Sequence, residues 1–221
     1  MSGQVFILNF HGLGPLPPGL SSGEADCWLD QSFFEAILDS IRERNDVRIT
    51  LDDANQSDYT GALPALKARN MRAQFFAVAQ RLDQKGYLST SHLQGLVAEG
   101  MEVGTHGMRH RRWTGLDADD LREELVQAKD RLEQIIGKPV QEAACPFGSY
   151  DRRVLAALRN LGYRKIFTSD TGPAMEDVWI QPRNTIRRSH DLAHIGSITS
   201  GAPVGFKKVL RDIKLKLKQW R

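Results

Sequence analysis

Two adjacent carboxylates close an apolar stretch that reads Val47-Arg48-Ile49-Thr50-Leu51-Asp52-Asp53. Its apolar and β-branched residues predict a strand that ends at the aspartates. About fifty residues later, another short predicted strand leads into His106-Gly107-Met108-Arg109-His110. Residues four apart are neighbours on a helix surface, so we expect a helical turn to present both imidazoles to one cation. The two stretches together predict a metal site at the ends of two strands.

The ligand types in this pattern indicate a reaction class. Two imidazole nitrogens and one carboxylate oxygen, with a fourth position open for water, form the usual ligand set of a catalytic zinc. The second aspartate is then free to hold or deprotonate a water whose pKa the ion lowers to roughly 7. The pattern therefore favours a hydrolase.

The composition is that of one ordinary globular domain. The chain has 221 residues and a formal net charge of +3, and it shows no linker, internal repeat or apolar run long enough to span a membrane. Cys27 and Cys145 lie far apart without metal-binding spacing, so we expect reduced thiols. The amino terminus lacks the features of a signal peptide, which predicts a cytoplasmic protein.

The basic character of the chain is concentrated at its carboxyl end. Residues 206–221 hold seven basic residues and one acidic residue, a local charge of +6 that leaves −3 for the remainder. This distribution gives no support to a nucleic-acid partner. Apolar residues at helical spacing predict a basic amphipathic helix over 204–221, which either packs on the domain of residues 1–203 or lies on an anionic membrane.

Strand-like and helix-like runs alternate along the rest of the chain. The predicted strands are 5–10, 47–52, 72–78, 101–104, 140–145, 165–169 and 183–186. This order predicts an α/β fold with helices outside a parallel sheet. A distorted (β/α) barrel of about seven parallel strands is favoured over an open sheet, because a barrel gathers the polar residues at its strand ends around one mouth.

Three motifs resemble, in order and spacing, signatures of the polysaccharide deacetylases, the NodB-like carbohydrate esterases. They are Thr50-Leu51-Asp52-Asp53, His106-Gly107-Met108-Arg109-His110 and Pro146-Phe147-Gly148-Ser149-Tyr150-Asp151. The resemblance covers roughly residues 5–190. It implies a zinc-type divalent metal held by Asp53, His106 and His110, with Asp52 as general base. The Phe147 N–H would help to hold the oxyanion during removal of an acetyl group from an N-acetylated sugar of a polysaccharide, oligosaccharide or lipid-linked precursor.

The chain departs from the family pattern at two functional positions. The third motif often begins with an arginine that pairs with the base, and the stretch 142–145, Glu-Ala-Ala-Cys, offers none. The late Leu-x-His motif, which supplies a general acid, has no clean match. His11 after the first predicted strand and His190 after the last are the candidates, with His11 favoured and Asp170 placed to orient such a histidine.

Further side chains could contact the substrate. Tyr150 belongs to the third motif, and Trp113 could stack on a sugar ring or pack in the core. Arg109, Arg111 and Arg112 flank the second histidine, where they form either a solvated surface or a site for an anionic sugar. The mixed nitrogen and oxygen ligand set also admits cobalt, nickel or manganese. The alternatives in function are an O-acetyl esterase or other amide hydrolase, and a glycan-binding protein without catalysis.

Overall fold

The computed structural model describes residues 3–200, and within them nine strands form one sheet in the order β7-β1-β2-β3-β4-β5-β6-β8, with β9 also pairing β1. Neighbouring strands from β1 to β6 run parallel. Their bounds are Gln4–Phe10 for β1, Val47–Asp52 for β2, Gln74–Ala77 for β3, Glu102–Thr105 for β4, Glu142–Ala144 for β5 and Lys165–Thr168 for β6. The predicted α/β barrel is confirmed.

The sheet closes through the segment that follows β6. β8 (Ile180–Pro182) pairs with β6, and β9 (Asn184–Thr185) pairs with β1, so Arg183 alone separates the strands on the two sides of the seam. The single strand predicted over 183–186 is therefore wrong in its bounds. The sequence pattern also missed β7 (Ala174–Met175), which pairs antiparallel with β1 and is too short to show any periodicity.

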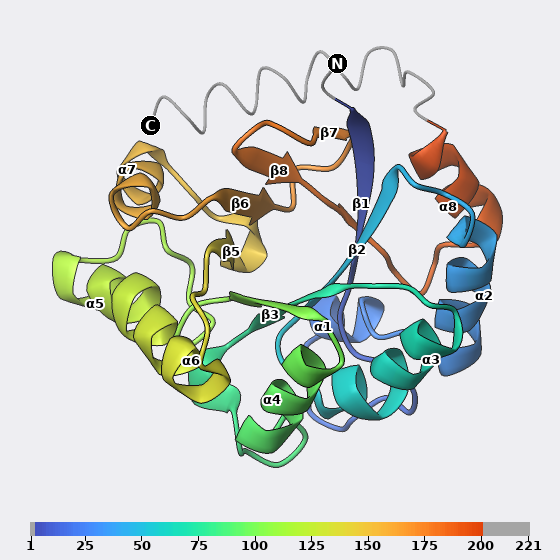
Figure 1. Cartoon of the computed structure of the whole chain (residues 1–221), viewed down its shortest axis with the longest axis horizontal. Coiled ribbons are helices and arrows are strands. Elements are labelled where there is room, and N and C mark those ends of the chain that lie inside the picture. Colours follow the sequence, from blue (N-terminus) through green and yellow to red (C-terminus); the bar gives the residue numbers. More distant parts are fainter. Residues whose placement is uncertain (1–2, 201–221) are drawn as a thin grey trace.

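Helices surround the sheet in the manner expected of a barrel (Figure 1). Their apolar faces pack onto the outer face of the strands, as in α2, where Phe34, Ile37 and Leu38 are fully buried. The bounds are Ser22–Asp26 for α1, Gln31–Ile41 for α2, Leu63–Ala68 for α3, Thr90–Ala98 for α4, Ala118–Arg122 for α5, Ala128–Ile136 for α6, Arg152–Asn160 for α7 and Leu192–Thr199 for α8. These helices therefore bury part of the outer face of the sheet under apolar side chains.

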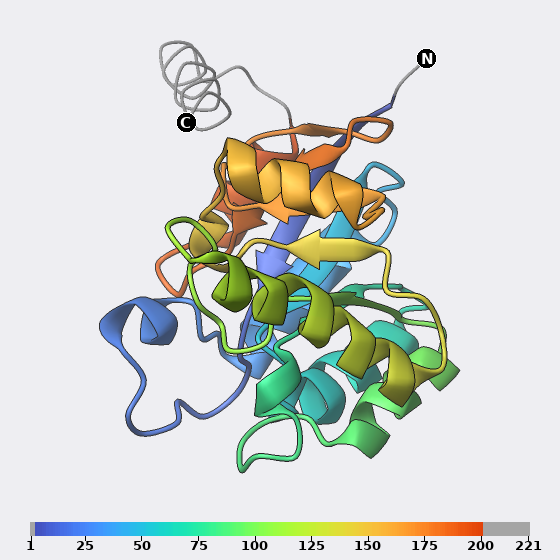
Figure 2. The same ribbon diagram turned by 90° about the vertical axis from the view of Figure 1, so that its left-hand side faces the viewer.

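A long loop with α1 joins β1 to α2 and stands out from the barrel (Figure 2). Trp28 holds the loop together, because its indole donates to Gly14 O at 3.1 Å and its ring lies directly against Gly12. A Cβ atom at position 12 would meet that ring at 2.0 Å, so this position requires glycine. The loop therefore keeps a defined shape beside the carboxyl ends of the strands.

None of the helices within residues 3–200 is long and apolar enough to cross a membrane. The basic helix predicted over 204–221 lies outside the described residues.

Candidate metal centre

The carboxyl ends of β2 and β4 bring the predicted metal ligands together. Asp53 follows β2 with a left-handed backbone (φ 84°), and His106 follows β4 directly. The prediction of a helical turn at 106–110 is wrong, because this stretch is a loop in which Gly107 and His110 both have positive φ. That loop still places the rings of His106 and His110 with centroids 5.0 Å apart.

Asp53, His106 and His110 form a compact set of potential ligands. Their candidate ligand atoms all lie within 4.8 Å of one another. His110 Nε2 and His106 Nε2 lie 3.1 Å and 3.8 Å from Asp53 Oδ1, an oxygen that accepts no hydrogen bond from residues 3–200. His106 Nδ1 donates to Ala144 O at 2.9 Å, the kind of outer bond that orients a metal-ligating imidazole and leaves Nε2 for the ion. The three residues therefore fit a divalent cation.

Burial keeps both imidazoles in the form that a metal requires. Burial lowers the pKa of His106 and lowers that of His110 to about 4, despite the nearby aspartates, which act in the opposite direction. Neutral imidazoles offer a lone pair without competition from a proton. Arg81, which the sequence analysis did not single out, supports the set: its guanidinium lies 3.2 Å from Asp53 Oδ1 and 3.3 Å from His110 Nδ1.

Asp52 has a bidentate partner that the motifs did not reveal. Arg183 donates from Nη1 and Nη2 to the two carboxylate oxygens of Asp52 at 2.7 and 2.8 Å. Arg183 is 0% exposed, and its Nη1 also donates to Asn9 Oδ1 at 2.9 Å. Asn9 in turn donates to Asp52 Oδ2 at 3.1 Å. The arginine missing from the third motif is thus replaced by one from the seam of the barrel.

This pairing sets the charge of Asp52. Burial alone would raise its pKa, but the charge of Arg183, together with His106 and the Arg183 hydrogen bonds, holds the pKa well below the usual range. Asp52 is therefore a carboxylate at neutral pH. One sequence signal could have indicated this partner: a lone arginine inside a predicted buried strand requires a counter-charge, and Asp52 lacked one.

A cavity of about 480 Å³ lies over the metal ligands, and its lining combines residues from distant parts of the chain. His11 lines it from the end of β1, and its buried Nδ1 accepts or donates no hydrogen bond within residues 3–200. Phe147 also lines it; this residue has a left-handed backbone (φ 57°) and is 53% exposed. The protruding loop contributes Ser21, Gly23, Glu24 and Cys27. The cavity is large enough for a sugar residue.

The structure places the other candidate residues away from the cavity lining. His190 stacks on His194 with ring centroids 4.0 Å apart. Asp170 accepts a hydrogen bond from the Tyr150 hydroxyl at 2.8 Å. Trp113 is fully buried and its indole nitrogen lies 3.4 Å from Glu124, so its ring offers no face to a sugar. Of the two histidines considered as general acid, only His11 lies in the cavity.

A third carboxyl lies buried near the site. Asp58 is 1% exposed, and neither of its carboxyl oxygens has a hydrogen-bond partner within residues 3–200. Burial, with the charges of Asp53 and Asp52, raises its pKa well above 3.8. Stability that depends on a protonated Asp58 is complete below the unfolded pKa and is lost as the pH rises through the folded pKa.

We therefore expect Asp58→Asn to stabilise the protein at pH 8, where ionisation of the buried carboxyl opposes folding, and to have a much smaller effect below pH 4. Urea unfolding of both proteins at the two pH values measures this difference. The exposed Asp177→Asn is the matched control and should change little at either pH. An equal increase in the free energy of unfolding at both pH values would show that Asp58 is not the source of the pH dependence of stability.

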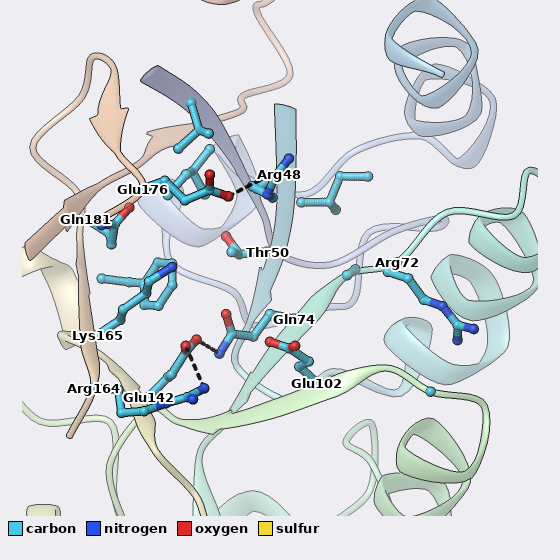
Figure 3. Close-up of a pocket in the computed structure, with 16 residues that line it drawn as sticks. Arg48, Thr50, Arg72, Gln74, Glu102, Glu142, Arg164, Lys165, Glu176 and Gln181 are labelled. Carbon is cyan, nitrogen blue, oxygen red and sulfur yellow. Dashed lines mark hydrogen bonds and ion pairs between the residues drawn. The ribbon is translucent and has the colours of Figure 1, made fainter. Parts of the chain in front are cut away.

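A second cavity, of about 420 Å³, opens at the amino ends of the strands (Figure 3). Four of its charged residues form two ion pairs, Arg48 with Glu176 at 2.8 Å and Arg164 with Glu142 at 3.8 Å. The neutral amide of Gln74 also donates to Glu142 at 2.5 Å. Phe167 lines this cavity and also lies 6.0 Å from the Arg183 guanidinium, so the apolar interior of the barrel separates it from the metal centre. Reactive groups of barrels gather at the opposite, carboxyl ends.

The fold and the site define a nearly closed (β/α) barrel with a candidate divalent-metal centre of one aspartate and two histidines. The model of the family described as polysaccharide deacetylase matches residues 39–166, more than half of the chain. The chain belongs to the polysaccharide deacetylase family, and the resemblance seen in the three motifs is confirmed.

Curated proteins match over somewhat more than half of this chain. An uncharacterized 30.6 kDa protein of Geobacillus stearothermophilus is 30% identical over 133 residues, which cover 57% of this chain and 47% of that protein. A chitin deacetylase of Pestalotiopsis sp is 29% identical over 130 residues, covering 59% and 43%. The chain thus spans about half the length of these curated relatives.

Solved structures share the fold at low sequence identity. A polysaccharide deacetylase from Bacillus cereus superposes with a TM-score of 0.80 at 21% identity, covering 89% of this chain and 69% of that one. A deacetylase from Streptococcus pyogenes, solved in complex with acetate, superposes with a TM-score of 0.80 at 18% identity, covering 90% and 99%. At these identities the likeness establishes the fold.

Proposed function

We propose that this protein is a metal-dependent hydrolase that removes acetyl groups from N-acetylated sugars of a polysaccharide, an oligosaccharide or a lipid-linked precursor. The observation that supports the proposal is that two neighbouring aspartates at the end of β2 have different surroundings. Asp53 faces the two histidines of the metal centre, while its neighbour Asp52 is held as a carboxylate by Arg183. One position can then bind a metal and the next can accept a proton.

The proposed roles follow from the geometry. Asp53, His106 and His110 hold the divalent metal, which we propose to be zinc because two imidazoles and a carboxylate are its common catalytic ligands. When bound there, such a metal would polarise the acetyl carbonyl and lower the pKa of water. Asp52, fixed by Arg183 and Asn9, takes the proton from the attacking water. The Phe147 N–H donates to the oxyanion, an interaction worth a few kcal/mol in the transition state.

We propose His11 as the general acid that protonates the departing amine. It lines the cavity beside the metal ligands, and its buried Nδ1 has no protein partner among the described residues. His190 does not line the cavity. Asp170, predicted to orient such a histidine, accepts a hydrogen bond from the Tyr150 hydroxyl, and its orienting role stays a prediction. The late tripeptide Leu192-Ala193-His194 lies on α8, and His194 does not line the cavity, so the histidine that follows β1 takes this role in the proposal.

Acetate release tests the proposal. The zinc-loaded protein is incubated with N-acetylhexosamine oligomers and with O-acetylated sugars, and the acetate that appears is quantified. We expect release from N-acetylated members, and a loss of about 10²- to 10⁴-fold for Asp52→Asn, the usual contribution of a general base. Release from O-acetyl esters alone would contradict deacetylation of amides, and release that survives Asp52→Asn would remove the base from the mechanism.

The same assay compares His11→Asn with His190→Asn. Only the first should lose activity, because only His11 lines the cavity. The cytoplasmic location predicted from the sequence, and contact of residues 204–221 with a membrane, stay predictions.

A further inference from the structure

The structure divides the three arginines that flank the second histidine ligand into two groups. Arg109 Nη2 pairs with Glu123 at 2.6 Å, and Arg111 Nη2 pairs with Asp120 at 2.7 Å. Arg112 forms no ion pair or side-chain hydrogen bond with any residue in 3–200. Arg112 is exposed to solvent, so its guanidinium is accessible and is not taken up by a neighbouring carboxylate.

Arg112 lies instead on an aromatic platform in the wall of the cavity. Its guanidinium carbon is 4.7 Å from the centre of the Phe147 ring, and that ring is 4.5 Å from the ring of His110. Arg112, Phe147 and His110 all line the cavity. Stacking occupies the face of a guanidinium and leaves its in-plane N–H donors for another partner. The Phe147 ring alone lies between the Arg112 guanidinium and the candidate metal ligand His110.

The other charged residues in the cavity wall already have partners. Arg187 pairs with Asp26, and the Glu24 carboxylate accepts bonds from the backbone and hydroxyl of Ser21. Asp52 pairs with Arg183, and Asp53 lies in the metal centre beside Arg81. Among the described residues, Arg112 is thus the charge of this wall without a polar protein partner.

We propose that Arg112 binds an anionic oxygen group, a carboxylate or a phosphate, on the sugar that carries the acetyl group. The forked donors of a guanidinium match both anions, and bonds between ionised partners are about twice as strong as neutral ones. This inference rests on the proposed function, because it specifies the substrate of the same cavity. An anion bound at Arg112 would fix the sugar with its acetyl group over the metal ligands.

Binding of matched sugar pairs tests the inference without requiring turnover. Calorimetry on the zinc-loaded 221-residue chain compares N-acetylglucosamine 1-phosphate with methyl N-acetylglucosaminide, and N-acetylmuramic acid with N-acetylglucosamine. We expect the anionic member of at least one pair to bind roughly 10- to 100-fold more tightly, the range for a hydrogen bond to a charged group. The pair that shows the preference identifies the anion as phosphate or carboxylate.

Two variants assign the preference to one residue. Arg112→Gln should bring the ratio of affinities close to one, whereas Arg111→Gln should leave it unchanged because Arg111 pairs with Asp120 and does not line the cavity. Equal binding of both members by the wild type overturns the inference. A preference for the anionic sugar that persists in Arg112→Gln also overturns the inference, because the metal and not Arg112 would then bind the anion. If the preference for the anionic sugar depends on Arg112 but the protein releases no acetate from any substrate, the inference is supported and the proposed function is contradicted.

Discussion

Replacing Arg183 with methionine should abolish most of the acetate release and destabilise the protein by about 3–5 kcal/mol, the usual effect of removing one partner of a buried ion pair. The variant leaves Asp52 buried at 2% exposure without its bidentate partner. Burial, which opposes ionisation, then acts without the compensating charge. The proton acceptor of the proposed reaction would become a neutral acid.

The pH dependence of stability should reverse as well. In the wild type, the lowered pKa of Asp52 contributes stability that is present above the unfolded pKa and is lost as the pH falls through the folded pKa. In Arg183→Met the raised pKa contributes stability at low pH that is lost as the pH rises. Urea unfolding from pH 3 to 8 measures both slopes.

Three companion variants separate this ion pair from general damage to the barrel. Asp52→Asn combined with Arg183→Met should cost less than the two single changes together, because the charges act as one unit. Arg183→Lys keeps the positive charge but loses the bidentate pair of hydrogen bonds to Asp52, so this variant should fold. Because Asp52 would then be stabilised less as a carboxylate, the acid limb of the pH-rate profile should lie at higher pH. Arg164→Met, whose guanidinium lies 3.8 Å from Glu142 at the other end of the barrel, should change stability by under about 1 kcal/mol. Additive effects in the double variant would show that the pair does not act as a unit.

His110→Ala and Asp53→Ala should each lower the affinity for a divalent metal by about a hundredfold or more. Loss of a residue that only orients a ligand already costs 10- to 100-fold, and a direct ligand contributes at least as much. Titration with zinc, followed by the metal content per chain after dialysis, measures the change.

The metal should also link binding to folding. A metal at a hundred times its Kd stabilises a protein by about 2.7 kcal/mol, and both variants should lose that gain in thermal unfolding. His190→Ala is the matched control, because His190 does not line the cavity and should leave one metal per chain. Wild-type affinity in His110→Ala would remove that residue from the proposed ligand set.

The sequence was sufficient for the features that local patterns record. Alternating strands and helices predicted the barrel, because the burial of each element repeats with the period of its backbone. The motif residues Asp53, His106 and His110 could be named because the short motifs that contain them follow recognisable strands and resemble the signatures of a family. The helical turn at 106–110 was wrong, since glycine and histidine with positive φ form a loop that a spacing rule does not anticipate.

Other parts of the site depended on contacts between distant residues. Arg183 and Asp52 are 131 positions apart, and no periodicity or motif connects them. The choice of His11 over His190 also required the closed barrel, because both follow strands near the same seam and only one lines the cavity. Arg112 differs from Arg109 and Arg111 only through the partners that surround it in space.

The sequence by itself thus determined the fold class, the family and the three candidate metal ligands of this protein. The tertiary structure decided which charge holds the proposed base, which histidine reaches the cavity and which arginine is available to a ligand. The physical reason is that secondary structure and motif spacing follow from neighbours along the chain. The ionisation of a buried group depends instead on every charge packed around it, whichever part of the chain supplies it.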